Sequence, residues 1–157
     1  MATTSSDDVP VVAPGPDHRP RPVPDPVTEQ YWAWVQREQL RLQWCAGCER
    51  RMFPPAPVCP GCRSEALEWR RVTGLGTIHT AGVVRKAFVP GFDPPYAVVS
   101  VQLAEQADLH MISNFPMDGD AAPRIGTPVR VAFERRPWGL LPQFVPRSAD
   151  DGGPDAD

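Results

Sequence analysis

Two cysteine pairs constrain this chain more than any other feature of its sequence. Cys45-Ala-Gly-Cys48 is followed after ten residues by Cys59-Pro-Gly-Cys62. Each pair has two intervening residues, so one tight turn directs both sulfur atoms toward a shared point. Four thiolates match the tetrahedral preference of zinc, and such a closed site is structural rather than catalytic. The spacing therefore predicts one structural zinc ion held by Cys45, Cys48, Cys59 and Cys62.

A glycine precedes the second cysteine of each pair. We expect a positive φ at Gly47 and Gly61, because the turn is tightest there. Two alternatives to zinc stay open at this point. Cys-Pro-Gly-Cys resembles a thioredoxin-type redox site, but such a site follows a buried strand, and Pro54, Pro55 and Pro57 precede Cys59 instead. Iron is the other alternative, since rubredoxin-like sites use the same four ligands.

The composition narrows the class of protein further. The 157 residues include 21 prolines and 12 glycines, too many for a helical bundle. The net charge is −3, with a single lysine, which argues against a nucleic-acid binder and a polybasic membrane anchor. The sequence has no signal-peptide pattern and no apolar run long enough to span a membrane. We therefore expect a cytoplasmic protein whose reduced cysteines bind metal.

Composition also divides the chain into four segments. Residues 1–26 hold seven prolines and are expected to form a disordered tail. Residues 27–72 carry a helix and the cysteine pairs, and residues 73–147 carry a run of alternating strands. Residues 148–157 contain four aspartates and no core material, so we expect a second disordered tail.

A short helix is predicted from about Glu29 to Gln39. Pro26 suits its first turn, and Asp25 or Thr28 supplies a cap. The helix is unusually aromatic, and its large side chains spread around most of its circumference. They either pack on their own domain or dock on another protein, since tryptophan and tyrosine are favoured interface anchors. The residues concerned are Tyr31, Trp32 and Trp34.

After Gly74 the pattern alternates and is rich in β-branched residues. The expected strands cover residues 75–86, 96–104, 108–115, 128–135 and 141–145. Five short strands in some seventy residues favour an oligonucleotide/oligosaccharide-binding (OB) barrel, with an SH3-like barrel or a small sandwich as alternatives. The predicted fold is thus mostly β, with an N-terminal helix, a rubredoxin-like zinc ribbon and a C-terminal five-stranded OB-fold barrel.

The remaining polar residues give no catalytic pattern. His79 and His110 lie on predicted strands without metal-ligand spacing, and no nucleophile elbow or phosphate-binding loop is present. Several arginines surround the cysteine pairs. They offset the negative charge of a tetrathiolate site or contact an anionic group, such as the phosphates of coenzyme A or acidic side chains of a partner. These arginines are Arg41, Arg50, Arg51, Arg63, Arg70 and Arg71.

Five segments in order resemble a known family. They read YWAWV, LRLQWCAGCERRMFPPAPVCPGC, LEWRRVTGLGTIHTAGVVRK, PGFDPPYAVVSVQL and IGTPVRVAF. This series, across about residues 27–146, resembles the zinc-ribbon/OB-fold family of thiolase-associated accessory proteins, formerly a domain of unknown function. Its most specific pieces are the Tyr-Trp helix, the Phe-Pro-Pro between the cysteine pairs and the Pro-Gly-Phe before Pro-Tyr-Ala. The match departs at Glu105-Gln106, where relatives commonly have an acidic residue and glycine, so the hairpin geometry is expected to differ there.

The resemblance implies a function. Members of this family are similar to non-catalytic subunits of hetero-oligomers with thiolase-like or lipid-transfer-protein-type enzymes, and they help to form an acyl-CoA site. Known settings are acetoacetyl-CoA metabolism, polyketide-type acyl transfer and retro-aldol cleavage of steroid side chains. The resemblance does not tell whether residues 87–95 form a lid over a partner's active site. The implied partner-binding residues are Tyr31, Trp32, Trp34, Phe53, Arg50 and Arg51.

Two other functions stay open. OB barrels and zinc ribbons bind single-stranded nucleic acid in other proteins, which requires a basic groove with aromatic platforms. The acidic net charge argues against this function. The chain could also bind acyl-CoA in its barrel and act as an enzyme by itself. The sequence does not name the substrate or the partner.

Overall fold

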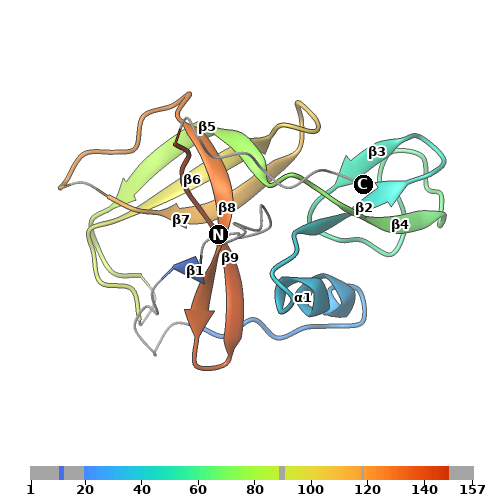
Figure 1. Ribbon diagram of the computed structural model, residues 1–157, viewed down its shortest axis with the longest axis horizontal. Helices are drawn as coiled ribbons and strands as arrows, with labels where there is room; N and C mark the ends of the chain where they lie inside the picture. Colours follow the sequence, from blue (N-terminus) through green and yellow to red (C-terminus); the bar gives the residue numbers. More distant parts are fainter. Residues whose placement is uncertain (1–10, 13–19, 89–90, 118, 149–157) are drawn as a thin grey trace, which may run out of the picture.

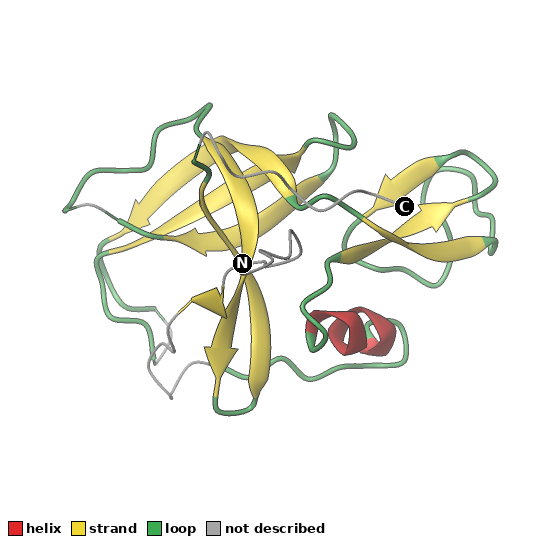
Figure 2. Ribbon diagram, in the orientation of Figure 1, coloured by secondary structure: helices red, strands yellow, loops and turns green. Residues whose placement is uncertain are grey.

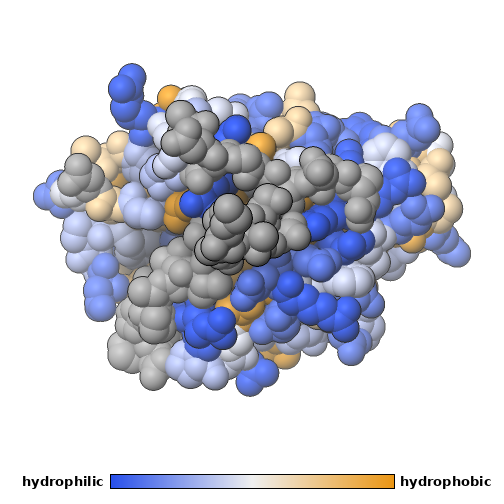
Figure 3. Space-filling view, in the orientation of Figure 1, coloured by the Kyte–Doolittle hydropathy of each residue, from blue (hydrophilic) through white to orange (hydrophobic). Residues whose placement is uncertain are grey.

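The computed structural model describes residues 11–12, 20–88, 91–117 and 119–148. Its described part is mostly β-structure with one short helix, as Figure 2 shows, so the predicted fold class is confirmed. Figure 1 shows a small three-stranded sheet on one side, a larger strand assembly on the other, and the helix below the small sheet. The face seen in Figure 3 is mainly hydrophilic, with small apolar patches.

Helix α1 spans Glu29–Val35 and is shorter than expected. The Asp25 carboxylate orders the turn before it, accepting hydrogen bonds from the Thr28 N–H at 2.8 Å and the Thr28 hydroxyl at 2.7 Å. The helix stops early because Glu38 adopts a positive φ of 58°. That left-handed residue lets the Gln39 N–H reach back to the Trp34 carbonyl at 3.1 Å, which is a common way to end a helix.

The ribbon sheet carries the cysteine pairs. Its strands are β2 (Arg41–Cys45), β3 (Arg50–Met52) and β4 (Leu67–Arg71), in the order β3-β2-β4. Both pairings are antiparallel, with Trp44 opposite Arg51 on one side and opposite Glu68 on the other. The first cysteine turn joins β2 to β3, and the second lies in the long connection from β3 to β4.

Five strands build the barrel, close to where alternation places them. They are β5 (Leu75–Val84), β6 (Tyr96–Leu103), β7 (His110–Phe115), β8 (Pro128–Arg136) and β9 (Gly139–Pro146). Strand β6 shows the expected alternation, with every second residue from Ala97 to Leu103 buried. A bulge in β5 between Ile78 and Thr80 shifts its register against β6.

The barrel strands follow the order β9-β8-β5-β6-β7, with all neighbours antiparallel. Side chains join the two end strands, β7 and β9. The Ser113 hydroxyl accepts a hydrogen bond from the Phe144 N–H at 3.0 Å, and the Gln143 side-chain oxygen accepts one from the Asn114 N–H at 3.1 Å. These contacts bring the ends together and give a closed barrel of the OB type.

One hydrophobic core runs through the helix, the ribbon and the barrel. Tyr31 and Val35 from α1 and Leu42 from β2 belong to the same buried cluster as Phe133 and Phe144 of the barrel. Gly74, in the link between ribbon and barrel, has a φ of +71°, and an added Cβ would lie 2.3 Å from Val131 Cγ1. The ribbon and the barrel therefore pack against each other and are not joined only by a flexible linker.

The N-terminal segment differs in part from expectation. Val11–Val12 form a two-residue strand, β1, that pairs in parallel with β8. Residues 20–24 are also described and border a cleft beside α1. Residues 1–10, 13–19 and 149–157 lie outside the described residues, so the expected disorder of the two tails stays a prediction there. In the described part of the chain, none of the helices has the length and apolarity to cross a membrane.

Candidate metal centre and contact surfaces

The four cysteines converge on one point. Their sulfur atoms all lie within 4.8 Å of one another. Cys45 Sγ and Cys62 Sγ are 3.5 Å apart, and Cys48 Sγ and Cys59 Sγ are 3.6 Å apart. Cys45 and Cys59 are buried, whereas Cys62 lies at the surface. The fold thus brings together the two pairs that the sequence predicted as one site.

The two cysteine turns have the same backbone geometry. In each, the residue after the second cysteine donates its N–H to the carbonyl of the first, from Glu49 to Cys45 and from Arg63 to Cys59, both at 2.8 Å. Glu49 and Arg63 have φ values of 55° and 62°. These residues, not the preceding glycines, take the left-handed conformation, so the expectation for Gly47 and Gly61 was wrong.

At one of the two positions, limited space for a side chain, and not a positive φ, explains why the residue is glycine. A Cβ added to Gly47 would lie 3.1 Å from Ser64 Cβ and 3.4 Å from Cys62 Sγ, so the two turns approach closely there. A Cβ added to Gly61 would make an ordinary contact of 3.8 Å with Cys59 Sγ. A larger residue at position 47 would therefore have to push Ser64 aside, because one turn packs closely against the other there.

The sulfur atoms differ in their readiness to lose a proton. The Cys62 N–H hydrogen-bonds to the Cys59 sulfur and lowers the pKa of Cys59 to about 6. The contact with Cys59 in turn raises the pKa of Cys48. The Ser64 N–H lowers the pKa of Cys62, but the contact with the Cys45 sulfur contributes to a net rise.

The cysteine site fits zinc. A tetrahedral centre with Zn–S bonds of about 2.3 Å places its sulfurs roughly 3.8 Å apart, which matches the spacing in this chain. Four thiolates fill the coordination sphere, so zinc here fixes the ribbon and has no open position for water or substrate. Cys45, Cys48, Cys59 and Cys62 thus form a structural zinc site.

The arginines around the ribbon are largely engaged within the chain. Arg51 and Arg70 lie over the Trp44 ring, at 5.2 and 4.5 Å from its centroid. Arg70 also pairs with Glu68 at 2.9 Å, and Arg50 pairs with Asp108. These contacts hold the guanidinium groups on the ribbon surface, against Trp44, Glu68 and Asp108.

The aromatic residues of the helix divide into two groups. Tyr31 is only 4% exposed and packs against Trp32 and Phe53, with ring centroids 5.1 and 5.4 Å away. Its side chain belongs to the core, which favours the alternative that this residue packs on its own domain. Trp32 and Trp34 are half-buried, and Trp34 is covered by Arg37 and Arg41.

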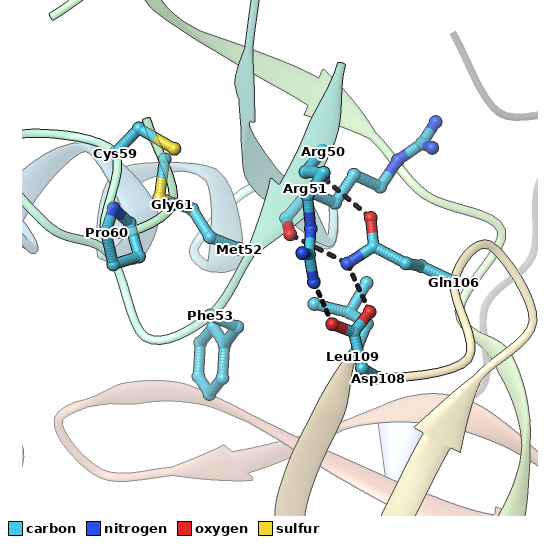
Figure 4. Close-up of a pocket in the computed structure, with 10 residues that line it drawn as sticks. All are labelled: Arg50, Arg51, Met52, Phe53, Cys59, Pro60, Gly61, Gln106, Asp108 and Leu109. Carbon is cyan, nitrogen blue, oxygen red and sulfur yellow. Dashed lines mark hydrogen bonds and ion pairs between the residues drawn. The ribbon is translucent and has the colours of Figure 1, made fainter. Parts of the chain in front are cut away.

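A cleft of about 340 Å³ lies between the ribbon and the barrel. Figure 4 shows Phe53 and Pro60 on one side of it and Gln106 and Asp108 on the other. Arg50 crosses between the two halves to reach Asp108. The sequence predicted only an altered hairpin at Gln106 and no contact for Asp108. No sequence pattern shows which turn of the barrel faces the ribbon, so these two contacts were missed.

The histidines form a separate pair on the outer face of the barrel. The rings of His79 and His110 meet edge to face, with centroids 4.6 Å apart. Ser100 Oγ lies 3.4 Å from His110 Nδ1, which is long for a hydrogen bond from a hydroxyl. His79 rather than a carboxylate stands against His110, so these residues do not complete a nucleophile–base–acid triad.

The fold and the metal site define a zinc-ribbon/OB-fold protein. Two adjoining family models match the chain: the rubredoxin-like zinc ribbon domain of ChsH2 over residues 32–68 and the C-terminal OB-fold domain of ChsH2 over residues 69–134. The chain therefore belongs to the ChsH2-type zinc-ribbon/OB-fold family, which confirms the resemblance found in the sequence.

Individual proteins show the same likeness. The chain is 29% identical over 126 residues to the 3-oxo-4,17-pregnadiene-20-carboxyl-CoA hydratase alpha subunit of Mycobacterium tuberculosis, covering 80% of this chain but only 40% of that protein. Among solved structures it resembles the Ltp2-ChsH2(DUF35) aldolase, with 28% identity, a TM-score of 0.71, and coverage of 80% of this chain and 98% of the other. A DUF35 protein of unknown function from Sulfolobus solfataricus shares the fold, at 11% identity and a TM-score of 0.56, over 78% of this chain and 86% of that one.

Proposed function

We propose that this chain is a non-catalytic accessory subunit that binds and stabilises a thiolase-superfamily enzyme acting on an acyl-CoA. In this proposal it works in the cytoplasm and helps to form the acyl-CoA site of its partner. The observation that carries the proposal is the similarity to the Ltp2-ChsH2(DUF35) aldolase, which extends over 98% of the matched chain. The name of the hydratase relative supports a CoA thioester as the class of substrate.

The chemistry of the chain supports an accessory rather than a catalytic role. Its zinc site is closed by four thiolates, so the metal does not activate water. The Ser100–His110 pair is long and stands on the outer face of the barrel, and in the described part of the chain the ring beside His110 is that of His79 rather than a carboxylate. A chain built in this way contributes a rigid surface, and the reacting groups belong to the enzyme that it binds.

The proposed contact surface lies around the cleft beside the zinc turn. Phe53 and Arg50 line this cleft, and Trp32 lines a second cleft of about 290 Å³ together with Trp138. Half-buried tryptophans and stacked arginines are frequent anchors at protein interfaces. We assign partner contacts to Trp32, Trp34, Phe53, Arg50 and Arg51, and leave Tyr31 to the core.

Co-expression tests this function. The chain is produced together with a candidate partner, a thiolase-like enzyme that acts on an acyl-CoA, and only the chain carries an affinity tag. We expect the enzyme to co-purify and to gain solubility. Trp32→Ala and Arg50→Ala should weaken the complex, whereas Gln30→Ala, on the exposed side of the same helix, should not.

Two results would contradict the proposal. In one, the two proteins elute separately and the solubility of the enzyme does not change. In the other, the isolated chain turns over an acyl-CoA, which would make it an enzyme in its own right.

The retro-aldol cleavage of a steroid side chain and an acyl transfer are the reactions that we propose to assay with the complex.

A further inference from the structure

The two edges of strand β8 pair with other barrel strands over different lengths. Along one edge it pairs with β9 from Val129 to Arg136. Along the other edge it pairs with β5 only from Pro128 to Arg130, and the Val131 N–H then reaches the Gly74 carbonyl at 2.8 Å. Beyond Val131, none of the barrel strands in the described part of the chain pairs with this edge. Beyond this point the edge of β8 thus lies outside the ladder that β8 forms with β5.

The N-terminal segment occupies this edge. Strand β1 (Val11–Val12) runs parallel to β8, with Val11 opposite Phe133 and Val12 opposite Glu134. Figure 1 shows β1 beside the β8–β9 hairpin, away from the main body of the barrel. This segment lies before residues 32–134, which the family models match. The extra strand therefore lies outside the part of the chain that the family models match.

The sequence keeps the added strand short. Pro10 and Pro14 flank Val11 and Val12, and proline has no N–H to donate to a ladder. The paired stretch has only two residues, fewer than the usual minimum for a strand in a globular protein. A strand held by so few hydrogen bonds can leave its site while the five-stranded barrel stays folded.

The edge itself is well supported. Ala132 and Phe133 are fully buried, and the Arg136 guanidinium pairs with the Glu134 carboxylate at 2.7 Å. The Gln143 side chain adds a hydrogen bond to Glu134 at 3.3 Å. The two contacts of Glu134 lie within β8 and between β8 and β9 and do not involve β1, so they support an extended edge when β1 is absent. A preformed extended edge is what strand addition requires.

We propose that the edge of β8 over residues 132–136 is a strand-addition site for an extended peptide segment in parallel orientation. Residues 11–12 of the same chain occupy it as a removable strand. The site binds a segment through backbone hydrogen bonds, which require the segment to be extended. A β-branched stretch such as Val-Val favours that extended conformation. This inference does not depend on the identity of the partner enzyme, because it concerns only the edge of β8 and the segment that covers it.

Hydrogen exchange of the full-length protein tests the first half of the proposal. The double variant Val11→Pro/Val12→Pro removes two backbone donors from β1 without shortening the chain. We expect the amides that face β1 within residues 132–136 to exchange roughly tenfold faster or more, with those that face β9 unchanged. The control is Val23→Pro, at a position that is 87% exposed. Equal exchange in both variants and the parent protein would overturn the proposal.

A peptide tests the second half. The synthetic segment DDVPVVAPGP, residues 7–16, is added to the double variant. We expect it to restore protection to the same amides of β8, and a peptide with both valines replaced by proline to have no effect. Failure of the parent peptide to change the exchange would contradict a strand-addition site. Zinc content and thermal unfolding of the double variant verify that the rest of the fold is intact.

Discussion

The side-chain amide of Gln106 pairs with both backbone groups of Arg51. Its oxygen accepts the Arg51 N–H at 2.9 Å, and its nitrogen donates to the Arg51 carbonyl at 3.1 Å. Gln106 belongs to the turn between β6 and β7, whereas Arg51 lies in the ribbon strand β3. Gln36, just after α1, makes the same pairing with Leu140 at the start of β9, at 2.9 and 3.1 Å. Two glutamine amides therefore hold the helix–ribbon half against the barrel.

Replacing Gln106 tests whether this pairing stabilises the fold. Gln106→Ala leaves the Arg51 N–H and carbonyl without their partner in a half-buried place. We expect the free energy of unfolding to fall by about 1–3 kcal/mol. Gln30→Ala, on the exposed face of α1, should change it by less than about 0.5 kcal/mol. Denaturant titration of both variants measures the difference, and equal effects would show that the pairing adds nothing.

The second pairing is tested through Gly139, which precedes Leu140. Gly139 has a φ of +137°, and an added Cβ would lie 2.3 Å from Gln36 Oε1. Gly139→Ala should therefore destabilise the protein through strain and through this clash. In a Gln36→Ala background the clash is absent, so the same substitution should cost less. A double-mutant cycle by thermal unfolding measures the coupling, and strictly additive effects would contradict the assigned contact.

The core position of Tyr31 gives a prediction that is independent of any partner. Tyr31→Ala leaves a cavity between Trp32 and Phe53 and should cost about 3–5 kcal/mol of stability. Tyr31→Phe keeps the ring contacts and should cost much less. Denaturation of the isolated chain measures both. If Tyr31→Ala left the midpoint unchanged and only weakened the complex, Tyr31 would be an interface residue after all.

Zinc binding is coupled to protons because metal requires thiolates. The pKa values of Cys48 and Cys62 are raised, so both are thiols at about pH 8 and each loses a proton when zinc binds. The pKa of Cys59 is lowered to about 6, so below about pH 6 a proton also competes with zinc for this sulfur. Zinc affinity should thus fall as the pH falls, and more steeply below about pH 6.

Calorimetry in buffers of different ionisation enthalpy measures this proton release. We expect at least two protons per zinc at about pH 8, one each from Cys48 and Cys62, and more as the pH falls below the pKa of Cys59. A heat that is the same in every buffer, or an affinity that stays constant from neutral to acidic pH, would contradict this assignment.

The sequence predicted those features that follow from local patterns. Cys45 and Cys48 are joined by one tight turn, so their spacing alone indicates a metal site. The buried residues of β6 alternate from Ala97 to Leu103, so period-two patterning found that strand. The helix ended earlier than expected because Glu38 takes a left-handed conformation that its residue type does not favour.

The features that were missed depend on contacts between distant segments. A glutamine such as Gln36 or Gln106 looks like an ordinary polar residue until the fold brings a backbone edge beside it. Tyr31 could face a partner or the core, and only the position of Phe53 decides between the two. The pairing of Val11–Val12 with β8 was also missed. A proline-rich composition predicts a disordered tail, and it does not indicate that two of its residues pair with a strand of the barrel.

The most direct test of this account is the metal content of the purified chain and its consequence for the fold. Native mass spectrometry should show one zinc ion per chain. Replacing Cys45, Cys48, Cys59 and Cys62 by serine should abolish zinc binding and unfold the ribbon. A chain that carries no stoichiometric zinc, and keeps its ribbon folded after all four sulfur atoms are removed, would contradict the account.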